Sequence, residues 1–60
     1  MTTQQALDAL YAAWEGSPDS LAATVETGRL SDADRRMVGE TDEDAVMAEL
    51  RAEYERLQRV

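Results

Sequence analysis

Residues 40–44 hold four carboxylates in five positions, the densest cluster of chemically capable side chains in this sixty-residue chain. Hard divalent cations prefer oxygen ligands, so a cation site is one interpretation of the cluster. An EF-hand loop beginning at Asp32 does not fit, because Arg36 and Met37 occupy the positions of a ligand and of the turn glycine. Carboxylates that follow Thr41 also suit the first turn of a helix, where they complement the positive end of its dipole. We therefore expect a capped helix start here and no bound metal.

The side chains that most often act as bases and nucleophiles are missing, because the chain has no histidine, cysteine or lysine. Ser17, Ser31 and Thr41 carry hydroxyl groups, but no base is present to activate one of them as a nucleophile. Paired carboxylates need a pocket that excludes water to shift their pKa values, and so small a helical domain has little room for one. Structural zinc and disulfides are excluded by the same composition. We predict that the protein is not an enzyme and uses no cofactor.

The chain is strongly acidic, with thirteen Asp and Glu residues, six basic residues and a formal net charge of −7. Such a chain repels phosphate backbones and anionic lipid headgroups, so we expect neither direct nucleic-acid binding nor a membrane partner. Residues 18–38 have the connection length of a helix-turn-helix, but Asp32 and Asp34 share the surface of the candidate reading helix with its two arginines. Spacing favours helix ion pairs instead, in which Arg35 and Arg36 contact Asp32.

The same acidity permits an alternative function, in which carboxylates imitate a DNA backbone and occupy a basic site on a nucleic-acid-binding protein. Acidic residues of the last segment, together with residues 42–44, would form the mimicking face. Arginines interrupt this face, and Arg51–Glu55 and Glu55–Arg59 have the spacing of ordinary i, i+4 ion pairs. An acidic inhibitor is therefore the second hypothesis, and a solvated helix face is the simpler interpretation.

Start and stop signals divide the chain into four helices. Four residues that favour N-cap positions begin them: Thr2, Ser17, Ser31 and Thr41. Three glycines stand at the positions where helices commonly end: Gly16, Gly28 and Gly39. The fold class is therefore all-α, a small helical bundle that forms one domain over residues 1–60. We expect two longer antiparallel helices (about 3–15 and 42–59) with two short helices (about 18–27 and 32–38) between them.

The two longer helices each carry an apolar stripe about 100° wide. Aromatic residues are enriched at interface cores, although in so small a domain the same residues also fill the core. We predict that the stripes contact a partner through two sets of residues: Leu7, Leu10, Tyr11 and Trp14 on the first helix, and Met47, Leu50, Tyr54 and Leu57 on the last.

A sixty-residue domain buries only roughly 60% of the surface that its unfolded chain exposes, so its stability is marginal. With disulfides and structural zinc excluded, assembly with other chains is the remaining source of stability. We predict a non-catalytic protein–protein interaction or structural subunit: an adaptor, a small component of a larger assembly such as a virion, or a homo-oligomer. No signal peptide or membrane-spanning run is visible, so the expected location is cytoplasmic. The absence of lysine fits a GC-rich genome or a salt-loving, halophilic host.

Overall fold

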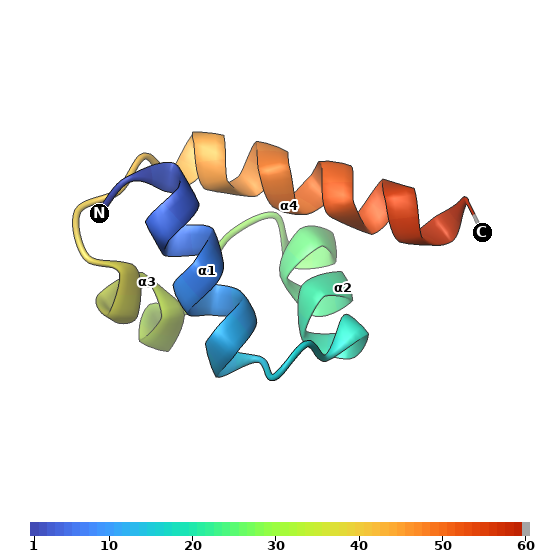
Figure 1. The fold of residues 1–60 in the computed structure, drawn as a ribbon, viewed down its shortest axis with the longest axis horizontal. Helices are drawn as coiled ribbons and strands as arrows, with labels where there is room; N and C mark the ends of the chain where they lie inside the picture. The colour runs from blue at the N-terminus through green and yellow to red at the C-terminus, as the bar shows by residue number, and fades with distance from the viewer. Residues whose placement is uncertain (60) are drawn as a thin grey trace.

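A computed structural model describes residues 1–59, which form four helices (Figure 1): α1 (Thr3–Ala13), α2 (Pro18–Thr27), α3 (Asp32–Val38) and α4 (Glu43–Gln58). The predicted all-α class is confirmed, and no strand occurs among these residues. The observed bounds of α2 and α3 coincide with the predicted ranges. The first helix ends two residues earlier than predicted, and the last is one residue shorter at each end.

The starts of the first three helices follow the predicted capping residues. The Thr2 hydroxyl accepts from the Gln5 backbone N–H at 3.1 Å, and the Gln5 side chain accepts from the Thr2 N–H at 2.9 Å, which completes a capping box. The Ser31 hydroxyl accepts from the N–H three residues on at 3.2 Å. Ser17 makes no side-chain cap, but Pro18 occupies the first helical position and has no N–H to satisfy.

The start of α4 differs from the prediction, because Asp42 rather than Thr41 is its N-cap. Asp42 Oδ1 accepts from the Ala45 backbone N–H at 3.2 Å. The Thr41 hydroxyl instead donates to the Val38 carbonyl oxygen at 2.9 Å, at the end of α3. The threonine therefore closes the preceding helix, and the neighbouring aspartate supplies the cap and a negative charge to α4.

The end of α1 also departs from the prediction, because Glu15 and not Gly16 is the first residue with a left-handed conformation. Glu15 has φ 54°. Its N–H donates to the Ala12 carbonyl at 3.2 Å, while the Gly16 N–H donates to the Tyr11 carbonyl at 3.2 Å. These two bonds form a Schellman motif, in which the position that glycine usually fills is held by a glutamate. The ends of α2 and α3 are glycines at positive φ, as predicted, with φ values of 82° at Gly28 and 64° at Gly39.

The two longer helices are not antiparallel, contrary to the prediction. The Met1 amino nitrogen donates to the Glu40 carbonyl at 3.2 Å, so the start of α1 lies beside the start of α4. Figure 1 shows the two helices leaving this common corner and diverging steeply. The reason is that α2 and α3, taken together, carry the chain back across the molecule to the side where α1 begins. The last helix therefore starts beside the start of α1 and not beside its end. Among the helices, α4 packs against α1 and α2, and α1 also packs against α3.

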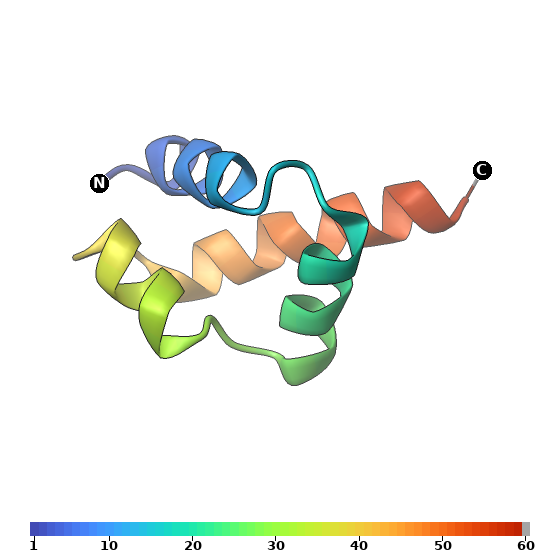
Figure 2. The same ribbon diagram turned by 90° about the horizontal axis from the view of Figure 1, so that it is seen from below.

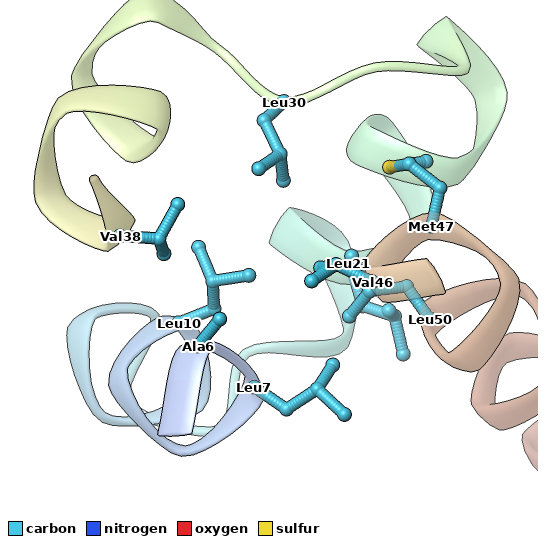
Figure 3. Packing of buried hydrophobic residues seen from close by; sticks show 9 residues of the cluster. All are labelled: Ala6, Leu7, Leu10, Leu21, Leu30, Val38, Val46, Met47 and Leu50. Atoms are coloured by element: carbon cyan, nitrogen blue, oxygen red, sulfur yellow. The ribbon is translucent and has the colours of Figure 1, made fainter. Parts of the chain in front are cut away.

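A core of nine side chains fills the centre of this arrangement (Figure 3), and every helix contributes to it. Leu30, from the α2–α3 connection, points into the same space and is 2% exposed. Thr24 is the buried polar residue, and its hydroxyl donates to the Ser20 carbonyl at 3.0 Å. The core residues are Ala6, Leu7, Leu10, Leu21, Leu30, Val38, Val46, Met47 and Leu50.

Candidate interaction groove beside the end of α4

The eight residues predicted to contact a partner divide into two groups in the structure. Four belong to the core and are at most 6% exposed: Leu7, Leu10, Met47 and Leu50. Their side chains hold the helices together and are inaccessible to another molecule. The remaining four are partly or fully accessible: Tyr11, Trp14, Tyr54 and Leu57.

Three of these four accessible residues line one open groove of about 340 Å³. The groove is lined by residues from the end of α1, from the α1–α2 connection, from the start of α2 and from the last turns of α4. Tyr54 packs against the core but is not part of the lining. The lining residues are Tyr11, Trp14, Gly16, Ser17, Pro18, Leu21, Glu53 and Leu57.

An aromatic pair from α1 forms one wall of the groove. The rings of Tyr11 and Trp14 meet edge to face, with centroids 6.2 Å apart and planes at 71°. Such pairs contribute roughly 0.5–1.5 kcal/mol beyond the area that they bury. The Trp14 indole N–H donates to Asp34 Oδ2 at 3.3 Å. Trp14 is therefore held by α3 and by the Tyr11 ring of α1, so its position in the groove is fixed before any partner binds.

The last turns of α4 also contribute to the lining, and they extend beyond the other helices in both views (Figure 2). Leu57 is 49% exposed, although it faces the groove. Its sequence neighbours are polar and exposed: Glu55, Arg56 and Gln58. Leu57 is thus an apolar side chain that the domain itself covers only in part.

Acidic side chains influence Tyr11 in the groove more strongly than basic ones do. Burial raises the pKa of the Tyr11 hydroxyl, and the carboxylates of Glu53 and Glu49 raise it further, whereas Arg56 opposes them. Glu53 forms an i, i+3 ion pair with Arg56, and its side chain is 30% exposed against 71% for the arginine. The glutamate therefore lies closer to the groove than the cation that pairs with it, and its charge is the larger influence on Tyr11.

Sequence reasoning did not identify Pro18, Leu21 and Glu53 as groove residues. Pro18 and Leu21 do have the helix-start and packing roles expected from their positions, but each also contributes to the lining. A usable signal was present in the shortness of the α1–α2 connection. Because residues 14–17 leave so little chain, α2 must begin beside the last turn of α1, where Trp14 lies.

Two of the four carboxylates of residues 40–44, those of Asp42 and Glu43, have structural roles. Asp42 caps α4, and the Glu40 backbone carbonyl accepts the Met1 amino group. Glu43 accepts from Arg35 Nε at 3.0 Å, and this hydrogen bond lowers the pKa of the Glu43 carboxyl. Within residues 1–59 no three acidic side chains converge in a way that could hold a metal ion.

The observed ion pairs agree only in part with the predicted spacing. Arg35 Nη1 lies 3.5 Å from Asp32 Oδ1, which confirms the i, i+3 pair, but Arg36 forms no ion pair in the described part of the chain. The predicted pairs of residue 55 with residues 51 and 59 are also absent between residues 1 and 59. The pair found on α4 is Arg56–Glu53, because its i, i+3 geometry brings the guanidinium over the groove-side carboxylate.

Comparison of the chain with protein-family models, with curated proteins and with solved structures finds no match. The geometry described above therefore carries the functional argument by itself. Over residues 1–59, none of the helices combines the length and apolar character that crossing a membrane requires.

Proposed function

We propose that this protein is a non-catalytic interaction domain that docks onto a protein partner through the groove between α1, α2 and α4. The observation that carries the proposal is the position of Leu57, which is half exposed and lines the same groove as the Tyr11–Trp14 pair. Aromatic and apolar side chains in a partly covered, preformed recess are typical of the central anchors of protein interfaces. An adaptor, or a small component of a larger particle, would use such a surface.

The groove is preformed, which supports docking with little reorganisation. Trp14 is fixed by its hydrogen bond to Asp34 and by the Tyr11 ring. Pro18 restricts the backbone at the start of α2. A recess that is already ordered loses less conformational entropy when a partner binds, so more of the contact energy appears as affinity.

Site-specific photo-crosslinking in cells that naturally make this protein tests the proposal. A benzophenone amino acid replaces Leu57 in one variant and Met37 in the control. Met37 is also an exposed apolar residue, at 37%, but it lies on α3 away from the groove. We expect one protein to crosslink from position 57 and not from position 37. The purified pair should then dissociate when Leu57→Asp is introduced and persist with Met37→Asp.

Two results would contradict apolar docking. One is the absence of a crosslinked protein at position 57. The other is a complex that survives Leu57→Asp but dissociates when salt is raised, because contacts between an exposed carboxylate face and a basic site are screened by ions, whereas apolar contacts are not. The second result would favour the acidic inhibitor instead.

A further inference from the structure

We propose that the occupant of the groove is a basic amphipathic segment of another protein, one that presents an apolar side chain to Leu57 and Pro18 and an arginine to Glu53 and the Tyr11–Trp14 pair. This inference rests on the proposed function and adds the chemistry of the partner. It is carried by charge complementarity between the groove and its occupant.

One acidic residue lines the groove, and two more are sequence neighbours of its lining residues. Glu53 is part of the lining, and Glu15 and Asp19 stand next to the lining residues of the α1–α2 connection. The positive charge of Arg56 lowers the pKa of Tyr11, but this effect is smaller than the increase that Glu53 causes. A positively charged segment therefore gains from the field of this surface, and a negatively charged one is repelled.

The aromatic wall favours a guanidinium group on the same segment. Arginine stacks on tyrosine and tryptophan rings while its N–H groups donate to a carboxylate, and Tyr11, Trp14 and Glu53 offer both kinds of contact within one recess. The apolar side chain of the occupant packs against Leu57. The groove thus distinguishes a segment with both features from one that is only basic or only apolar.

A second copy of this chain does not fit the groove. Each copy carries a formal net charge of −7, so two copies repel one another. A standard protein–protein interface buries about 800 Å² on each partner, which is roughly a fifth of the 4125 Å² surface of this chain and more than a recess lined by eight residues offers. A short segment of a larger protein matches the size of the recess better.

The fluorescence of Trp14, the one tryptophan of the chain, reports occupancy of the groove directly. The probes are short helical peptides without tryptophan that differ only in the residues on one face. The first has leucine and arginine, the second leucine and glutamine, the third leucine and glutamate, and the fourth alanine and arginine. We expect the leucine–arginine peptide to bind at least about tenfold more tightly than each of the others.

Glu53→Gln is the decisive variant, and Glu26→Gln is its matched control. Both remove one carboxylate and so change the net charge equally, but Glu26 lies near the end of α2 and outside the lining. Glu53→Gln should weaken the leucine–arginine peptide about three- to tenfold and leave the leucine–glutamine peptide unchanged. Glu26→Gln should leave both affinities within about twofold. Circular dichroism confirms that each variant keeps its helices.

Three results would overturn the inference. The peptides could bind without preference for arginine, or Glu53→Gln and Glu26→Gln could have the same effect. Trp14 fluorescence could also change with protein concentration alone, which would assign the groove to a second copy. The proposed function fails separately, through the crosslinking experiment: a crosslinked partner whose contacting segment is not basic would refute this inference and leave docking at the groove intact.

Discussion

The indole N–H of Trp14 donates to Asp34 Oδ2 at 3.3 Å, and this hydrogen bond joins the end of α1 to the first turn of α3. The two residues are twenty positions apart and belong to helices that pack directly against each other. The bond is part-buried, so an unsatisfied indole N–H would remain if the acceptor were removed. Trp14 therefore links the fold of the domain to the wall of the groove.

Removal of this acceptor should destabilise the protein by an amount typical of one hydrogen bond. We expect Asp34→Ala to lower the free energy of unfolding by about 1 kcal/mol and to speed hydrogen exchange of the Trp14 indole N–H. The control is Asp32→Ala, which removes a carboxylate from the same helical turn but from a side chain that is 88% exposed. Urea unfolding followed by circular dichroism measures the free energy of unfolding of both variants. Equal losses for the two variants would show that helix-dipole effects, and not the Trp14 contact, explain the result.

Most of the helix ends were predictable because their signals are local. The Thr2–Gln5 capping box and the Ser31 cap depend on residues three positions apart, and both form as the sequence indicates. The Thr41 hydroxyl could either cap the start of α4 or bond to the end of α3, and it donates to the Val38 carbonyl at the end of α3. That choice depends on where α3 ends relative to α4, which spacing alone does not define.

The packing of the helices was not predictable from their stripes. Leu50 and Leu57 fall on the same apolar seam of α4, yet one is fully buried and the other half exposed. The difference arises because α1 and α4 diverge from a common corner, so the seam is covered at its start and uncovered at its end. Periodicity identifies a face of a helix, whereas the crossing of the helices decides how much of that face is covered.

Alanine substitutions should separate the two ends of this seam. Leu50→Ala leaves a cavity in the core and should cost about 2–5 kcal/mol, a large share of the roughly 3–9 kcal/mol expected for a domain of this size. Leu57→Ala should change the free energy of unfolding by less than about 0.5 kcal/mol, because its side chain is 49% exposed. Urea denaturation measures the free energy of unfolding of both variants. A loss at Leu57 as large as that at Leu50 would place Leu57 in the core.

Glycine at position 15 should stabilise the protein. Glu15 holds the left-handed position of the Schellman motif at φ 54°, where a side chain is strained and glycine is not. It is also an acid at the negative end of the α1 dipole. We expect Glu15→Gly to raise the free energy of unfolding by about 1 kcal/mol. Glu15→Ala is the control, since it removes the charge but keeps the strain, and it should gain only a few tenths of a kcal/mol.

The contact between Arg35 and Glu43 should make stability depend on acid pH. The hydrogen bond from Arg35 holds the pKa of the Glu43 carboxyl below its ordinary 4.5. The carboxylate form is therefore favoured by folding, and its contribution is complete above pH 4.5 and is lost as the pH falls through the lower, folded pKa. Arg35→Gln should reduce the slope of stability against pH in that range. Arg36→Gln removes the same charge from a neighbour that has no ion pair within residues 1–59, and it should not change that slope.

Alkaline titration of Tyr11 reports the burial of its hydroxyl and the charges that surround it in the groove. Burial, then Glu53, raises the pKa of its hydroxyl above the ordinary 10.0. The folded protein thus keeps this proton to a higher pH than the unfolded chain does, so the contribution of Tyr11 to stability is complete below pH 10.0 and decreases as the pH rises above it. The difference in tyrosinate absorbance between the wild type and Tyr11→Phe isolates this one titration.

Substitution of the groove carboxylate should move this titration in a known direction. Glu53→Gln should lower the midpoint of Tyr11 because it removes the largest charge that disfavours the phenolate, while Glu26→Gln should leave the midpoint unchanged. If instead the wild-type midpoint lies at or below 10.0, or both variants shift it equally, the groove is not locally negative. A basic segment would then have no electrostatic preference for the groove, and its selection would have to come from the apolar contact at Leu57 alone.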